Sequence, residues 1–157
     1  MHASTVLITL LPACLTTAHF TRQVNQCAGN KNTIGHCETL TFIDRTASTP
    51  NAPTPAQCQS TCRDLFTDAG DWIVDFKGQP EGYRQNMLNS ACRFSMGRAP
   101  GAPRNYQFYM DNQDIADIID EAVKRFGEGG KVAAEGLVRC DGLEATWYIS
   151  LLPGASS

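Results

Sequence analysis

Acidic side chains at two regular spacings are the first candidates for chemistry. Asp71 and Asp75 lie on one side of a predicted strand, and Asp114, Asp117 and Asp120 line one side of a predicted helix. A glycosidase needs two carboxylates that converge on the bond to be cleaved. Both sets fit solvated outer faces better, because acids early in a helix suit its dipole and charged side chains are rarely buried. We therefore assign no catalytic role to these carboxylates.

Histidine and nucleophilic side chains offer little else for catalysis. A secreted ribonuclease usually needs an acid–base pair, commonly with a histidine, and His36 is nearly alone in this role. A Glu–Arg pair is an alternative that the sequence leaves open. The Gly-x-Ser-x-Gly motif of serine hydrolases does not occur in the chain. We expect no catalytic residue, no enzyme activity and no cofactor.

Cysteine is the residue type whose chemistry the sequence indicates most strongly. Of the seven cysteines, Cys14 falls in a predicted signal peptide. An even number in the remaining small chain predicts three disulfides, although the sequence alone does not choose their pairing. A zinc site is disfavoured because Cys58-x3-Cys62 lacks a second close pair, so we expect no metal. The cysteines predicted to form disulfides are Cys27, Cys37, Cys58, Cys62, Cys92 and Cys140.

The N-terminal residues 1–18 have the pattern of a secretory signal peptide. Val6–Leu15 is an apolar run too short to span a bilayer, and Thr16-Thr17-Ala18 is a small-residue cleavage site. No later stretch approaches the roughly 20 apolar residues of a membrane helix. We expect a secreted, extracellular protein, with translocation into host cells as an option.

Bulk properties limit the classes of partner. The chain has 157 residues, enough for one ordinary domain, and a formal net charge of −3. This charge and the lack of a Lys/Arg run argue against a nucleic-acid partner. We expect a monomer that contacts a host or competitor protein or a cell-surface component, and the sequence does not identify its binding residues.

The element around which the chain is organised is a predicted helix over residues 112–126. Its apolar residues recur at the helical period, and its outer side carries acids early and bases late. Asp111 or Asn112 can cap the start of this helix, and Gly127 can end it.

A predicted hairpin follows the helix. Its strands span 131–140 and 144–151, and Asp141-Gly142 between them is a strong turn signal. One face of each strand is apolar, so the helix and the hairpin can bury each other as the core of a two-layer α/β domain.

The earlier part of the chain predicts shorter elements. Residues 19–53 are polar and largely irregular, and disulfides must pin them to the body. The expected elements are a short edge strand at 40–43, a helix at 54–69, strands at 72–76 and 92–96, and a short aromatic strand at 106–110, with 83–90 left unassigned.

These elements predict an α+β fold. It is a disulfide-stabilised two-layer sandwich, in which two helices pack on one face of an antiparallel sheet of about four strands. The domain spans residues 54–152, and a flexible tail follows at 153–157. Trp72 and Trp147 fall on apolar strand faces and are expected in the core. The better candidates for the surface are Tyr83, Tyr106, Tyr109 and Tyr148.

Several short motifs occur in a fixed order between residues 37 and 150. The most specific are Asn112-Gln113-Asp114-Ile115, Phe126-Gly127-x-Gly129-Gly130-x-Val132 and Cys140…Trp147-x-Ile149. They follow Cys37…Thr41-Phe42…Pro55-x-x-Cys58…Gly70-x-Trp72…Ala91-Cys92-Arg93-Phe94. The ordered set resembles the fungal necrosis-inducing-factor domain, which comprises homologues of a leaf-mould extracellular effector and also occurs fused to killer-toxin-like chitinases.

The resemblance implies a secreted, cysteine-rich effector that is toxic to host or competitor cells, with no established catalytic residues. Four cysteines belong to the family's pattern, namely Cys37, Cys58, Cys92 and Cys140. Cys27 and Cys62 are additional to it, and on that basis we expect them to pair with each other. The other pairs stay open.

Three functions fit these features. The preferred hypothesis is an effector that binds a target in a host plant or a competitor, and that induces necrosis or suppresses defence. One alternative is a small secreted hydrolase such as a ribonuclease. The other is an inert protein that binds chitin or the cell wall.

Overall fold

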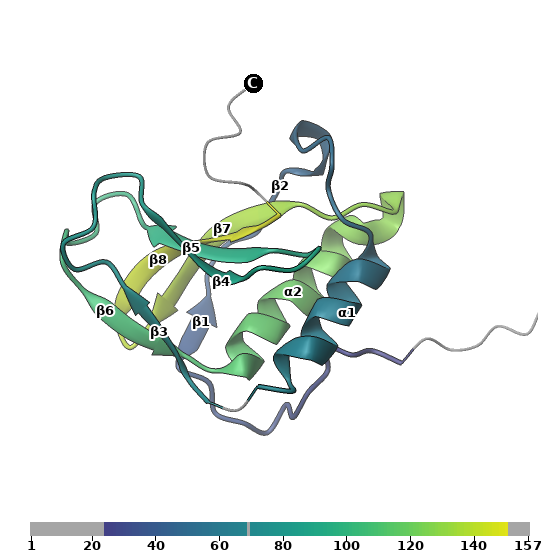
Figure 1. Ribbon diagram of the computed structural model, residues 1–157, viewed down its shortest axis with the longest axis horizontal. Coiled ribbons are helices and arrows are strands. Elements are labelled where there is room, and N and C mark those ends of the chain that lie inside the picture. The colour runs from purple at the N-terminus through teal and green to yellow at the C-terminus, as the bar shows by residue number, and fades with distance from the viewer. Residues whose placement is uncertain (1–23, 69, 151–157) are drawn as a thin grey trace, which may run out of the picture.

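A computed structural model of the chain describes residues 24–68 and 70–150 (Figure 1). The predicted signal peptide at 1–18 and the predicted tail at 153–157 lie outside these residues. The described elements, in chain order, are β1 (Cys37–Thr39), β2 (Ile43–Asp44), the 3-10 helix η1 (Thr46–Ser48), α1 (Pro55–Leu65), β3 (Trp72–Asp75), β4 (Arg84–Leu88), β5 (Phe94–Arg98), β6 (Gln107–Met110), α2 (Asn112–Phe126), the 3-10 helix η2 (Gly127–Gly129), β7 (Ala134–Cys140) and β8 (Leu143–Ile149).

The β7–β8 hairpin is the centre of the larger sheet. The two strands pair from Ala134 opposite Ile149 to Cys140 opposite Leu143. The predicted turn at Asp141-Gly142 is confirmed, and both residues have the positive φ that a tight hairpin turn requires. The sheet has the antiparallel order β1-β7-β8-β5-β4, and β2 also pairs with β7. The unassigned region 83–90 therefore contains the edge strand β4.

The smaller sheet consists of β3 and β6, which pair antiparallel. The α+β class is confirmed, but six strands in one sheet and two in another differ from the single sheet of about four strands that we predicted. The two sheets stay separate because β3 and β4 are joined through the Gln85 side chain and not by backbone pairing. Its Nε2 donates to the Ile73 carbonyl at 2.6 Å, and its Oε1 accepts from the Asp75 amide at 2.8 Å.

Both helices begin with a capping box, in which a side chain and a backbone amide bond reciprocally. The Thr54 hydroxyl of α1 accepts from the Gln57 amide at 3.3 Å, and Gln57 Oε1 accepts from the Thr54 amide at 2.8 Å. In α2 the Asp111 carboxylate accepts from the Asp114 amide at 2.7 Å, and the Asp114 carboxylate accepts from the Asp111 amide at 3.0 Å. α2 spans the predicted residues, whereas α1 ends at Leu65, before the predicted end.

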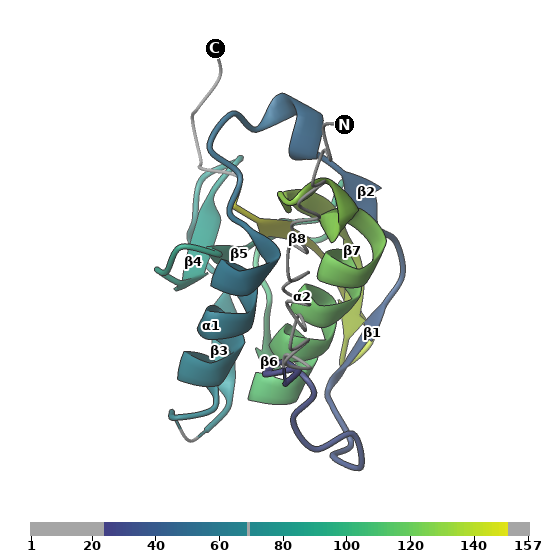
Figure 2. The ribbon, with the colours of Figure 1, turned by 90° about the vertical axis from the view of Figure 1, so that its right-hand side faces the viewer.

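The two helices lie side by side on the same side of the larger sheet (Figures 1 and 2). Their buried apolar residues form one core cluster with the inward residues of β5, β7 and β8, so the mutual burial of helix and hairpin is confirmed. The largest fully buried side chains of this core include Trp147, Phe94, Met96, Ile115, Ile118 and Ile119.

The chain that crosses β7 at Gly136 comes too close for regular strand pairing on that side of β7. A Cβ at this position would lie 1.9 Å from the Thr41 carbonyl oxygen, so only glycine leaves room for the crossing segment. The amides of Leu40 and Thr41 both donate to the Leu137 carbonyl, which makes the segment bulge. The edge strand predicted at 40–43 is therefore displaced, and the chain pairs with β7 on either side of the crossing, as β1 and β2.

Two aromatic residues differ from their predicted burial. Trp147 is fully buried, as expected, but Trp72 is only half-buried at the start of β3. Tyr106 is buried, although it was a surface candidate: its ring stacks on Phe108 with centroids 6.0 Å apart, and its hydroxyl donates to the Glu144 carbonyl at 2.8 Å. A satisfied hydroxyl removes the cost of burying a tyrosine.

Candidate functional site

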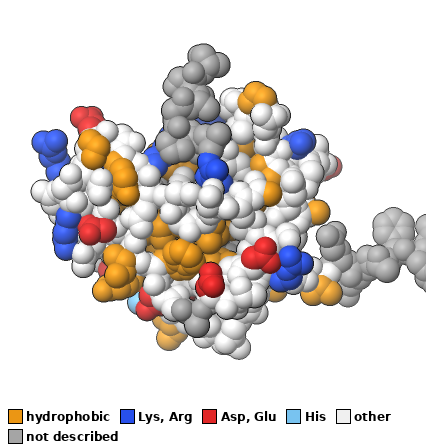
Figure 3. Space-filling view, viewed as in Figure 1, with side chains coloured by type: hydrophobic (Ala, Val, Ile, Leu, Met, Phe, Trp, Pro, Cys, Tyr) orange, Lys and Arg blue, Asp and Glu red, His pale blue; other side chains and the backbone are white. Residues whose placement is uncertain are grey.

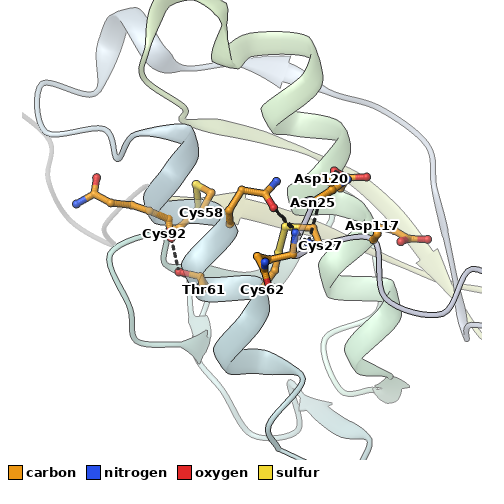
Figure 4. Close-up of a disulfide and its surroundings, with 12 residues drawn as sticks. Asn25, Cys27, Cys58, Thr61, Cys62, Cys92, Asp117 and Asp120 are labelled. Carbon is orange, nitrogen blue, oxygen red and sulfur yellow. Dashed lines mark hydrogen bonds between the residues drawn. A yellow bond between two sulfur atoms is a disulfide. The ribbon is translucent and has the colours of Figure 1, made fainter. Parts of the chain in front are cut away.

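Three disulfides brace the region around the helices. Cys27–Cys62 ties the N-terminal segment (residues 24–36) to α1, Cys58–Cys92 ties α1 to the chain before β5, and Cys37–Cys140 ties β1 to β7. Figure 4 shows the first two beside α1, with Asp117 and Asp120 of α2 next to the N-terminal segment. The segment is therefore held at Cys27 and again, just after its end, at Cys37.

The acidic side of α2 holds the N-terminal segment, which corrects our prediction of a solvated face. Asp120 is 3% exposed and accepts from Asn25 Nδ2 at 2.9 Å. Asp117 stays exposed but pairs with Lys31. The prediction failed because these partners lie far away in sequence, so the helical period of α2 carries no sign of them.

Asp114 in the first turn of α2 fixes the end of the same segment. Its carboxylate accepts from the backbone amides of His36 at 3.1 Å and Cys37 at 3.2 Å, in addition to that of Asp111. Burial raises the pKa of the Asp114 carboxyl above its usual range, while the three amides act in the opposite direction. Gln113 Oε1 accepts from the Asn30 amide at 2.8 Å, so the segment runs past the start of α2 in one fixed path.

Two adjoining hollows open where the chain leaves α1 and enters α2. The first has a volume of about 310 Å³ and is lined by Asp68, Gly70, Asp71, Trp72 and Asn112. The second, of about 300 Å³, shares three of these residues and adds Asn30, Thr33, Phe66, Asp111 and Gln113. We call Phe66, Asp68, Asp71, Trp72, Tyr109 and Asn112 the acidic surface.

Asn112 fixes the geometry of the acidic surface. Its Oδ1 accepts from the Trp72 indole Nε1 at 2.6 Å, and its Nδ2 donates to the Asp68 carbonyl at 2.6 Å. The indole and the chain after α1 are thus both attached to the first residue of α2. A surface that is already ordered loses little conformational entropy when it binds a ligand.

Large apolar side chains are exposed on and beside this surface. Phe66 is 37% exposed and Tyr109 is 41% exposed, and Ile73, which lies opposite Tyr109 in the smaller sheet, is 50% exposed. Large apolar side chains exposed beside acidic ones are a feature of interaction sites.

His36 joins Tyr109 to the rest of the acidic surface. Its Nε2 lies 4.0 Å from Asp71 Oδ1, its Nδ1 lies 3.7 Å from Asp141 Oδ1, and its ring centroid is 6.4 Å from that of Tyr109. An exposed imidazole between two carboxylates is an arrangement that could serve acid–base chemistry.

The two carboxylates predicted on one side of the first strand, Asp71 and Asp75, lie in different surroundings. Asp71 precedes β3 and belongs to the acidic surface. Asp75 ends β3, where its carboxylate accepts from the Lys77 amide at 2.8 Å and stabilises the turn. They are not a converging pair.

The opposite end of the smaller sheet carries a different hollow, of about 670 Å³, beside the loops that join β3 to β4 and β5 to β6. We call Arg84, Arg98, Arg104 and Tyr148 the arginine end. The Arg84 guanidinium carbon lies 3.6 Å from the centroid of the Tyr148 ring. Arg98 donates to the carbonyls of Phe76 at 3.3 Å, Gln79 at 3.1 Å and Arg104 at 3.1 Å, and also to that of Pro80.

Of the residues of the acidic surface, sequence analysis considered only Asp71, as a carboxylate, and Tyr109, as a surface aromatic. Trp72 was expected in the core, Asn112 was considered as a helix cap, and Phe66 and Asp68 were assigned to the predicted helix 54–69. Because α1 ends at Leu65, Phe66 and Asp68 lie outside the helix, and the run Asp68-Ala69-Gly70-Asp71 is the sequence signal that could have indicated an earlier helix end.

Within residues 24–68 and 70–150, no three His, Cys, Asp or Glu residues are grouped so as to hold a metal ion. None of the helices in this part of the chain has the length and apolar character needed to cross a membrane.

Comparison with known proteins places the chain in a family. Residues 36–140, well over half of the chain, match the Hce2 family model, whose description is "Pathogen effector; putative necrosis-inducing factor". The chain is also similar to a protein of Penicillium expansum named Probable chitinase LysM18, with 23% identity over 142 residues. That alignment covers 84% of this chain but only 9% of the larger protein, so the chain spans a small part of its relative. The chain belongs to the Hce2 family of pathogen effectors.

Proposed function

We propose that this chain is a secreted effector that binds a target of a host plant or a competitor through the acidic surface and catalyses no reaction itself. The observation that carries this proposal is the exposed aromatic and acidic residues on a frame fixed by Asn112. Family membership supports the effector role. The three disulfides and the predicted signal peptide support secretion, since disulfides persist in oxidising compartments.

A matched pair of variants tests the proposal. Phe66→Ala removes an exposed aromatic side chain from the acidic surface, and Ile43→Ala removes an apolar side chain of similar exposure, 45%, from β2. We expect wild type and Ile43→Ala to capture the same target from host or competitor extract, and Phe66→Ala to bind it about tenfold more weakly. Equal capture by all three proteins would contradict the proposal.

A hydrolase is the second candidate, because His36 lies between Asp71 and Asp141. The test is cleavage of single-stranded RNA by purified wild type and by His36→Gln, which keeps a polar side chain but cannot act as an acid or base near neutral pH. Cleavage by the wild type that is lost in His36→Gln would favour this candidate over binding.

Cell-wall binding is a third candidate, because the similar Penicillium expansum protein is named as a probable chitinase. Retention on chitin beads, and its loss in Phe66→Ala or Tyr109→Ala, would favour this candidate. Aromatic side chains are the groups most able to stack on an apolar ligand face.

A further inference from the structure

The acidic surface carries negative charge, and the basic group beside it is the His36 imidazole, 4.0 Å from Asp71 Oδ1. Asp68 and Asp71 are exposed, and Asp111 lies at the edge of the second hollow. None of the residues that line the two hollows is Lys or Arg. Some acids elsewhere on the surface do have such partners: Asp64 pairs with Arg63 at 3.0 Å and Glu121 with Arg125 at 2.8 Å.

The same hollows also have apolar walls. Phe66 lines the second hollow together with Asp71, and the half-buried indole of Trp72 lines the first. The stems of Lys and Arg side chains are apolar and pack on such walls, while their charged heads are attracted by carboxylates and by aromatic faces. Carboxylates and aromatic rings in one hollow thus complement a segment that is both basic and apolar.

Other ligand classes fit these residues less well. The described residues offer no group of three ligands for a metal ion, and carboxylates in hollows lined by no Lys or Arg repel the phosphates of a nucleic acid. We propose that the acidic surface binds a basic segment of a protein partner, with Lys or Arg beside Asp68 and Asp71 and an apolar side chain against Phe66. This inference rests on the proposed binding function and names the class of its partner.

Charge complementarity of this kind predicts a salt-dependent interaction. Exposed carboxylates attract a basic partner at long range and raise its association rate, and salt screens this attraction over about 8 Å at physiological ionic strength. The contact with Phe66 is apolar and is much less sensitive to salt.

A peptide library tests the charge of the partner without presupposing its sequence. Random 12-residue peptides displayed on phage are selected on immobilised wild type, and the affinities of the enriched peptides are then measured by fluorescence anisotropy. The variants are Asp68→Asn/Asp71→Asn, Phe66→Ala, and the control Glu81→Gln, which removes an exposed acid beside the arginine end. All variants are checked for wild-type circular dichroism.

We expect enriched peptides with positive net charge and at least one large apolar residue. Their affinity should fall about tenfold in Asp68→Asn/Asp71→Asn and in Phe66→Ala, and stay unchanged in Glu81→Gln. Selection of no peptide, of neutral or acidic peptides, or of peptides that bind the doubly substituted variant as well as wild type overturns the inference.

Target capture from extract distinguishes a failure of this inference from a failure of the proposed function. If target capture from extract is lost in Phe66→Ala but unchanged in Asp68→Asn/Asp71→Asn, the binding function stands and the basic partner is wrong. If the substitutions of the aspartates change only self-association in size-exclusion chromatography, the surface contacts a second copy of the chain, and the inference is also overturned.

Discussion

The two ends of the smaller sheet use charge in opposite ways. At the arginine end, Arg98 donates to carbonyls from two loops, and Arg84 covers the ring of Tyr148, so their charged groups hold the protein together. At the acidic surface, the side chains of Asp68 and Asp71 line open hollows that contain no Lys or Arg. Figure 3 shows basic side chains at the left edge, over the loops of the arginine end. This difference is what we expect if one end stabilises the fold and the other, as proposed, faces a partner.

The largest expected effect comes from removing the Cys27–Cys62 disulfide. This disulfide anchors the N-terminal segment, whose residues Asn30 and Thr33 line the second hollow. Substituting both cysteines by alanine should lower the free energy of unfolding by about 4 kcal/mol, because the bridge closes a loop with a sequence separation of 35. Chemical denaturation of wild type and variant measures this difference. Peptide mapping without reduction should first link Cys27 to Cys62; a different pairing would remove the basis of the prediction.

Hydrogen exchange of the same variant sharpens the comparison between the two ends. The amides of the N-terminal segment, including that of Asn30, should exchange faster, while those of the loops held by Arg98 should not change. Equal acceleration at both ends would show that the disulfide braces the whole fold, and not the acidic surface in particular.

Arg98→Ala should have the next largest effect. The substitution leaves several carbonyls of two loops without their charged donor, and we expect a loss of about 3 kcal/mol in the free energy of unfolding. The control is Arg104→Ala, at an exposed arginine of the same hollow, which should change this free energy by less than about 0.5 kcal/mol. Equal effects of the two substitutions would contradict a structural role for Arg98.

Asp114→Asn should lower the free energy of unfolding by about 2 kcal/mol. Both carboxylate oxygens of Asp114 accept hydrogen bonds from backbone amides, whereas the side-chain NH2 of asparagine can only donate, so at least one of the three amides loses its acceptor. The effect should depend on pH. Because the pKa of Asp114 is raised in the folded state, its contribution to stability falls as the pH rises through that pKa. The difference between wild type and variant should therefore be largest below the ordinary carboxyl pKa and shrink as the pH rises through the raised pKa of Asp114; a difference that grows with pH would contradict this.

The smallest effect on stability is expected at the acidic surface itself. Asp68→Asn/Asp71→Asn should change the free energy of unfolding by less than about 0.5 kcal/mol, since both side chains are exposed. Thermal unfolding near neutral pH measures this change. A loss comparable to that of Arg98→Ala would mean that these carboxylates also serve the fold, and the contrast between the two ends would disappear.

Local signals in the sequence predicted the local structure. The span and cap of α2 follow from its apolar period and from Asp111, and the β7–β8 turn follows from Asp141-Gly142, because each depends on neighbouring residues. The division into two sheets does not follow in this way. It depends on the Gln85 side chain meeting β3 across the fold, a contact that no local period records.

The candidate site was harder to predict for the same reason. Asn112 looked like a cap, but its side chain connects Trp72 to the chain after α1. The carboxylates of α2 looked solvated, but Asp114 and Asp120 are buried under the N-terminal segment. Contacts between distant parts of the chain decide both outcomes.

The most direct test of the binding account is the response of plant tissue, and of fungal competitors, to three purified proteins at equal concentration. These are wild type, Phe66→Ala and Ile43→Ala, each with intact disulfides and a wild-type melting temperature. The account predicts a response to wild type and to Ile43→Ala that is strongly reduced for Phe66→Ala. A full response to Phe66→Ala, or none to wild type in either kind of organism, would contradict it.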